Sequence, residues 1–225
     1  MNNIKLSLKM IGAFVLVAVI AGVVGAIGYF TLVNVSETYN HIVEEQMPGV
    51  IELGALGQAQ GSVLASERGL FLNDLISDRT VRQQQYDVIE NAWQTINANW
   101  ASYEGRERSV EEERLWQKFT PAWNQWKANH EKAIQLLKER DRLIDAGKNF
   151  GDPEVDRLDS EAWGFSVVAR ENFEASAAIL NELMNANHQA ALAADRAADT
   201  QAATARMTIN VTIAIAIVAA IGFGV

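Results

Sequence analysis

Residues 109–137 read SVEEERLWQKFTPAWNQWKANHEKAIQLL, and this stretch decides the fold. Its large apolar residues recur at spacings of three, four or seven, which is the periodicity of a helix with one buried face. Ser109 and Glu112 have the spacing of a capping box, and the acidic run 111–113 suits the positive end of a helix dipole. The stretch therefore predicts a long amphipathic helix that is capped at Ser109 and bent at Pro121.

The sequence before this stretch predicts two more helices. One covers residues 79–103, with Gly105 as its C-terminal cap. The other continues out of an apolar N-terminal stretch toward Asn73, and we expect Pro48 to kink it. No run of residues alternates with a period of two, and the hairpin dipeptides Asn-Gly and Asp-Gly are absent, so strands are not expected.

A fourth helix is expected from Ser166 onward. Residues 147–165, which include Trp163, would then form a distal cap before it, although Asp152 and Pro153 have the pattern of an N-cap and a first helical position. The first and last helices have matching lengths outside the apolar ends of the chain. The fold class predicted is all-α, an up-down-up-down four-helix bundle between two transmembrane helices.

The two ends of the chain are apolar and uncharged. Residues 11–32 could span a hydrocarbon core of ~30 Å at ~1.5 Å per residue, and residues 207–225 form a second stretch of this kind. We expect transmembrane helix 1 at 11–32 and transmembrane helix 2, truncated by the end of the fragment, at 207–225. A cleaved signal peptide is the alternative for the first, but its apolar run exceeds the about 7–15 residues of a usual signal sequence.

The distribution of basic residues predicts the orientation. Lys5 and Lys9 precede the first span, and the next basic residue is Arg68. By the positive-inside rule, residues 1–10 form a cytoplasmic N-terminus, and residues 33–206, with 17 basic and 28 acidic side chains, form an extracytoplasmic domain.

Composition excludes several classes of function. A net charge of −9 argues against nucleic-acid binding, and the absence of cysteine excludes disulfides and thiol catalysis. The histidines are isolated, so no metal site is expected. No motif for phosphate binding or nucleophilic catalysis occurs, so we expect no enzyme activity, no catalytic residues and no cofactor. The histidines lie at positions 41, 130 and 188.

Two repeated patterns each have two interpretations. A small residue recurs every four positions in the first helix, which favours either packing inside the bundle or close contact with the same helix of a second subunit. Aromatic residues recur in the second and third helices, which favours a core stripe over a ligand cage. The small residues are Gly57, Gly61, Ala65 and Gly69, and the aromatic series begins with Tyr86, Trp93 and Trp100.

Arg68 and Arg170 are the first candidates for ligand binding. Helix lengths place them at nearly the same height on the first and last helices, where facing guanidinium groups would bind a carboxylate between them. The alternative is that each pairs with a nearby glutamate, namely Glu67, Glu171 or Glu174. Two aromatic residues complete the set of candidate ligand-binding residues, Tyr86 and Trp163.

The chain resembles the sensory half of bacterial methyl-accepting chemotaxis receptors. The residues that carry the resemblance are Met47-Pro48-Gly49, the run Ser66-Glu67-Arg68-Gly69-Leu70-Phe71-Leu72, the pair Ala122-Trp123 and the stretch 186–206. The resemblance implies a bacterial inner-membrane protein with a periplasmic sensor domain. It also implies a parallel homodimer that binds a small molecule, such as an organic acid or amino acid, near the distal end.

In that family, arginines near the top of the first helix hold the ligand carboxylate, and only Arg68 falls in that region here. The resemblance further implies that ligand shifts the fourth helix, which signals through the second span to a cytoplasmic kinase complex. Two rivals stay open. The output could instead be a histidine kinase or a cyclic-dinucleotide enzyme, or the domain could be a ligand-free structural or partner-binding stalk.

Overall fold

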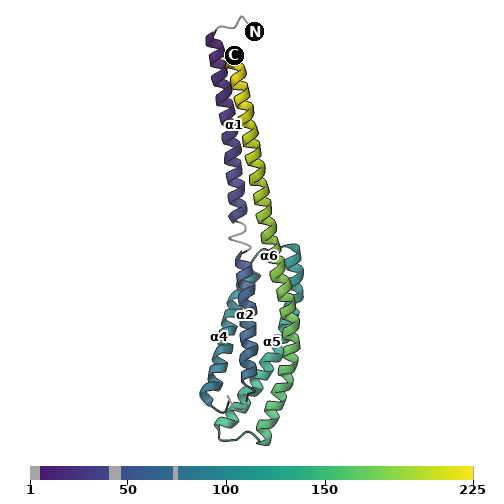
Figure 1. Ribbon diagram of the computed structural model, residues 1–225. Helices are drawn as coiled ribbons and strands as arrows, with labels where there is room; N and C mark the ends of the chain where they lie inside the picture. The colour runs from purple at the N-terminus through teal and green to yellow at the C-terminus, as the bar shows by residue number, and fades with distance from the viewer. Residues whose placement is uncertain (1–5, 41–46, 73–75, 225) are drawn as a thin grey trace. The chain divides into compact units, whose positions relative to one another are not determined.

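A computed structural model describes residues 6–40, 47–72 and 76–224 of the chain, and all regular structure in them is helical (Figure 1). The chain divides into two compact units. Met1–Glu45 with Ala190–Val225 form one, here called the terminal unit, and Gln46–Gln189 form the other, here called the bundle unit.

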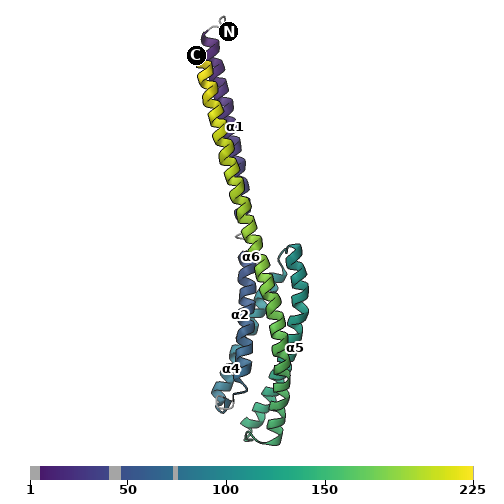
Figure 2. The ribbon, with the colours of Figure 1, turned by 45° about the vertical axis from the view of Figure 1, so that its right-hand side comes forward.

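The helices of the bundle unit run in alternating directions, as both views of the ribbon show (Figures 1 and 2). They are α2 (Met47–Gly69), α4 (Arg79–Glu104), α5 (Val110–Asp145) and the first part of α6 (Pro153–Gly224). This arrangement confirms the predicted up-down-up-down four-helix bundle. The end at which α2 ends, α4 begins, α5 ends and α6 begins is here called the distal end.

Helix caps in the structure follow the sequence signals. Ser109 and Glu112 form the predicted capping box: the Ser109 hydroxyl accepts from the Glu112 N–H at 3.2 Å, and the Glu112 carboxylate accepts from the Ser109 N–H at 2.8 Å. The Asp78 side chain accepts from the Thr80 N–H at 2.7 Å and so begins α4. Pro121 lies inside α5, and the bend expected there stays a prediction.

The start of α6 corrects one expectation. The Asp152 side chain accepts from the Glu154 N–H at 3.0 Å, and α6 begins at Pro153 rather than near Ser166. An aspartate cap followed by proline is a stronger start signal than any later position, and nothing after it breaks the helix. Trp163 therefore belongs to α6 and not to a separate cap.

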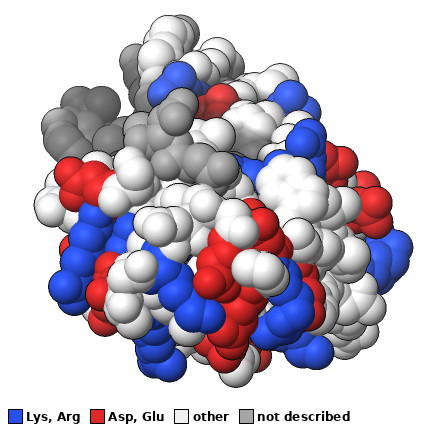
Figure 3. Space-filling model, turned by 90° about the horizontal axis from the view of Figure 1, so that it is seen from below, with Lys and Arg blue, Asp and Glu red and all other residues white. Residues whose placement is uncertain are grey.

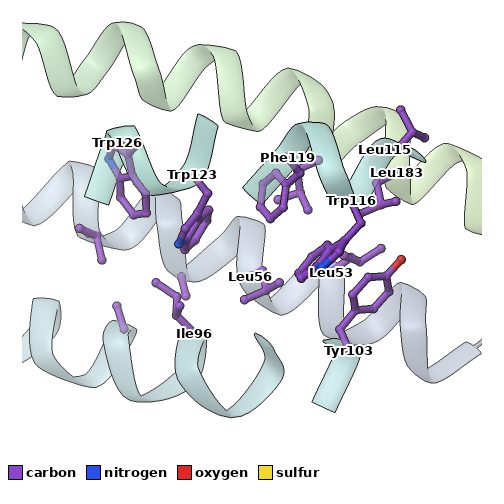
Figure 4. Packing of buried hydrophobic residues seen from close by; sticks show 14 of the residues in the cluster. Leu53, Leu56, Ile96, Tyr103, Leu115, Trp116, Phe119, Trp123, Trp126 and Leu183 are labelled. Atoms are coloured by element: carbon purple, nitrogen blue, oxygen red, sulfur yellow. The ribbon is translucent and has the colours of Figure 1, made fainter. Parts of the chain in front are cut away.

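The predicted aromatic stripe forms the core of the bundle unit (Figure 4). Phe119 and Trp126 are fully buried, and Trp123 meets Trp126 edge to face with ring centroids 4.7 Å apart. Trp93 and Trp100 pack against this cluster from α4. The core interpretation is thus confirmed for these tryptophans, and aromatic burial on this scale dominates the packing energy.

The small residues of α2 divide between two environments. A Cβ at Gly57 would lie 3.3 Å from Leu180 Cδ2, and one at Gly69 would lie 2.9 Å from Gln85 Oε1. Gly61 faces open space, and Ala65 is exposed. Packing inside the bundle therefore accounts for the two ends of the series, and contact of its middle with a second subunit stays a prediction.

The terminal unit pairs α1 (Leu6–Asn40) with the last part of α6, and the two lie side by side in antiparallel directions (Figures 1 and 2). Met10–Thr38 is long and apolar enough to cross a membrane. Large apolar side chains are exposed on both helices, among them Phe14, Leu32, Met207, Ile215 and Val218. Lys5 lies outside the described residues, and the second span at 207–225 stays a prediction.

Candidate functional site

Arg68 and Trp163 meet at the distal end of the bundle unit. The guanidinium carbon of Arg68, near the end of α2, lies 5.3 Å from the centroid of the Trp163 ring on α6. Phe71 meets the same ring edge to face at 5.1 Å. Trp163 is 44% exposed and Arg68 is half-buried. The structure thus brings together two of the four candidate residues on a partly open aromatic surface.

Arg68 has an unused hydrogen-bond donor. Its Nε is buried and makes no hydrogen bond among the described residues. An unsatisfied buried donor of a charged group costs free energy, and a ligand oxygen would recover it. The guanidinium therefore stays a candidate for binding a carboxylate.

Glu67 does not pair with Arg68, because it is committed to a buried network. Its carboxylate is fully buried. It accepts a hydrogen bond from the Ser166 hydroxyl and forms another with Nδ1 of His130. The Trp93 indole N–H donates to Nε2 of His130 at 3.3 Å. Since Nε2 accepts this bond, the ring proton lies on Nδ1 and points at Glu67. The network joins α2, α4, α5 and α6.

Arg170 lies apart from Arg68. It is exposed, and its Nε donates to Glu174 on the same helix at 2.9 Å. Gln60 bonds to Ser176 at 2.7 Å and Glu67 bonds to Ser166, so Arg170 lies within about one helical turn of the level of Arg68. Arg170 thus lies close to the height predicted for it. Its guanidinium pairs with the neighbouring Glu174, which is the alternative to a shared site with Arg68.

Tyr86 lies in a different place, in a cleft between α4 and α5. Its hydroxyl donates to Asp141 at 2.8 Å, and the Lys138 ammonium lies 5.5 Å from the centroid of its ring. Burial, with the Asp141 carboxylate beside it, raises the pKa of the Tyr86 phenol well above its ordinary value. The cleft has a volume of about 930 Å³ and is lined only by residues of these two helices.

Two buried arginines, which the sequence does not predict as functional residues, hold the distal end together. Arg140 is fully buried, donates to the Leu70 carbonyl at the end of α2 at 3.0 Å, and pairs with Asp141 and Asp159. Arg82 donates to the Ile76 carbonyl at 2.6 Å and pairs with Asp145. Both arginines stand at helical spacing from apolar core positions, and that spacing is the signal that could have identified them.

Charge on the surface of the distal end is mixed. Seen from that end, basic and acidic side chains alternate, without a large patch of one sign (Figure 3). Within residues 6–40, 47–72 and 76–224, no group of three potential metal ligands lies together. His41 lies outside these residues. The predicted absence of a metal site therefore stays a prediction for the whole chain.

Residues 3–161 match the family model described as "Four helix bundle sensory module for signal transduction". Comparison with curated proteins and with solved structures gives no match.

Proposed function

Because the chain belongs to the family of four-helix-bundle sensory modules for signal transduction, of the methyl-accepting chemotaxis type, we propose that it is the ligand-binding part of a membrane receptor. The bundle unit lies outside the cytoplasm, in the periplasm of a bacterium. It binds a small organic anion at its distal end. It acts by binding rather than by catalysis.

The terminal unit anchors the receptor in the membrane. Its two helices are antiparallel, and both expose rows of large apolar side chains that water would not favour. A helix satisfies its backbone hydrogen bonds internally and so tolerates a hydrocarbon environment. These features support two spans that place both chain ends on the same side of the membrane.

The environment of Arg68 is the single observation that supports the ligand proposal. Its buried Nε lacks a partner, and its guanidinium lies over a tryptophan of which 44% is exposed. A carboxylate could accept from this donor while the apolar part of the ligand covers Trp163 and Val167, which lie one turn apart on α6. We leave Arg170 out of the site because its guanidinium is already paired on the solvent side.

The signal travels through α6. This helix begins at the distal end of the bundle unit, carries Trp163, and continues without interruption into the terminal unit. A ligand that contacts both Arg68 on α2 and Trp163 on α6 binds one relative position of these helices better than another, and this difference biases α6. The kinase complex that reads this bias would be cytoplasmic.

The receptor works as a parallel homodimer in this proposal. The open middle of the small-residue series on α2, at Gly61 and Ala65, would allow a second copy to approach closely. A histidine kinase or a cyclic-dinucleotide enzyme could serve as the output domain with the same sensory half. Ligand binding by the bundle unit therefore does not depend on the type of output domain.

A thermal-shift screen of the full chain in detergent tests the proposal. Small carboxylates and amino acids are added singly, and unfolding is followed by tryptophan fluorescence, because all six tryptophans lie in the bundle unit. We expect at least one small carboxylate to raise the unfolding temperature. If no compound stabilises the chain, the bundle is a ligand-free or partner-binding stalk and the proposal fails.

A further inference from the structure

The cleft between α4 and α5 is separate from the Arg68 site and has its own chemistry. One stripe of each helix lines it, with side chains at spacings of three and four. Its floor is apolar and aromatic, with Ile89 and Ile134 almost fully buried and Tyr86 and Trp93 half-buried. A volume of about 930 Å³ accommodates a small organic molecule.

The charge of the cleft is unusual for this chain. Five basic and four acidic side chains line it, although residues 33–206 hold 17 basic and 28 acidic side chains. Many of these charges are already paired inside the cleft. The pairs are Arg82 with Asp141 and Asp145, Arg79 with Asp145, and Lys127 with Glu131.

Two basic side chains of the cleft, Lys138 and Arg142, form no ion pair among the described residues. Only one acidic side chain of the cleft, Glu90, is likewise without an ion pair there. Lys138 lies over the Tyr86 ring at 5.5 Å, and Lys127 lies over the Trp93 ring at 5.2 Å. The cleft thus offers two aromatic rings, each with an ammonium group over one of its faces. An anion with a flat apolar body satisfies both features, because its ring covers the aromatic floor and its charge meets Lys138.

We propose that the α4–α5 cleft is a second ligand site, which binds aromatic carboxylates with Lys138 as the anion-binding residue and Tyr86 and Trp93 as the floor. This inference goes beyond the proposed function, since it involves neither α2 nor α6 and does not depend on Arg68. A ligand there would contact α4 and α5 alone.

Titration of the full chain in detergent with benzoate tests the inference, by calorimetry and tryptophan fluorescence. Acetate supplies the charge without the ring, and benzyl alcohol supplies the ring without the charge. We expect saturable binding of benzoate and much weaker binding of the other two. Lys138→Met should weaken benzoate binding by about tenfold, the loss expected for one charge-assisted hydrogen bond.

Lys132→Met is the matched control. Lys132 lies on the same helix, is exposed like Lys138, and also stacks on an aromatic ring, that of Phe165 at 5.2 Å. Its replacement should leave benzoate affinity unchanged. Equal affinity of the two variants, or benzyl alcohol binding as well as benzoate, overturns the inference.

Single tryptophan replacements distinguish this site from the Arg68 site. If benzoate occupies the cleft, its fluorescence response should persist in Trp163→Phe and be lost in Trp93→Phe. A response lost only in Trp163→Phe would overturn the inference and leave the proposed function intact. Absence of any benzoate binding overturns the inference alone, because the thermal-shift screen tests the proposed function with other anions.

Discussion

The guanidinium carbon of Arg68 lies 5.3 Å from the centroid of the Trp163 ring, and this contact joins α2 to α6 at the distal end of the bundle unit. It places a cation with an unpartnered buried Nε directly on the helix that continues into the terminal unit. An anion bound to this guanidinium would contact both α2 and α6. In the proposed receptor, this contact would link ligand recognition to the helix that carries the signal.

The buried network around Glu67 should be essential for stability. Glu67→Ala would leave the His130 Nδ1–H and the Ser166 hydroxyl without a partner, at a cost of about 1–3 kcal/mol for each orphaned group. Glu67→Gln, which keeps the shape and one acceptor, should lose less. Glu171→Ala, at an exposed position of α6, is the control. Urea unfolding of the full chain, followed by tryptophan fluorescence, gives the midpoints, and equal midpoints for Glu67→Ala and the control would refute this role.

Arg140 should be the most costly basic residue to remove. Arg140→Met would leave the Leu70 carbonyl and the Asp159 carboxylate without their donor and remove a charge partner of Asp141, and breaking a buried ion pair costs about 3–5 kcal/mol. Arg114→Met removes an exposed pair with Glu111 and should leave the midpoint unchanged. The same urea experiment compares the two variants. A midpoint for Arg140→Met equal to that of Arg114→Met would contradict the structure.

Alkaline pH should unfold the bundle through its buried tyrosines. Burial raises the pKa of Tyr103 from 10.0 to about 12, and burial also raises the pKa of Tyr86. Below pH 10 both folded and unfolded chains keep these protons, so stability is unaffected there. Above pH 10 the unfolded chain ionises first, and stability falls as pH rises toward the folded pKa.

Tyr103→Phe should therefore flatten the loss of stability between pH 10 and about 12. The measurement is the unfolding midpoint at a series of alkaline pH values, with the ultraviolet absorbance of the phenolate recorded in parallel. A decline in Tyr103→Phe as steep as in the unmodified chain would show that this phenol does not control the transition.

The sequence predicted those features of the fold that depend on local signals. The capping box at Ser109 and the helix start at Pro153 follow from residues a few positions apart, and the aromatic stripe follows from helical periodicity. The length match between the first and last helices predicts a later start, near Ser166, but the structure follows the local cap signal at Asp152 and Pro153. Local chemistry was the better guide there.

The candidate site was predicted only in part, because it depends on how each helix is rotated about its axis. Helix lengths place Arg68 and Arg170 at similar heights, but they do not determine which way each side chain points. The partners of Glu67 lie 63 and 99 positions away in the chain, so no local pattern reveals them. The sequence predicts Tyr86 as a ligand-binding residue but not its cleft, which forms only when α4 and α5 pack.

Membrane topology can be mapped cleanly because the chain contains no cysteine. We expect Glu107→Cys, at an exposed position between α4 and α5, to react with a membrane-impermeant maleimide in intact bacteria. Asn3→Cys should react only after the cells are made permeable, since the positive-inside rule predicts a cytoplasmic N-terminus before the proposed first span. Labelling of Asn3→Cys in intact cells would reverse the proposed orientation.

The most direct test of the central claim is a calorimetric titration with the carboxylate that stabilises the full chain most in the thermal-shift screen. Arg68→Ala should weaken its binding by about tenfold or more, as expected for a lost charge-assisted hydrogen bond, with the circular dichroism of the chain unchanged. Arg170→Ala should bind like the unmodified chain, because its guanidinium is paired with Glu174. Unchanged affinity in Arg68→Ala would contradict the account.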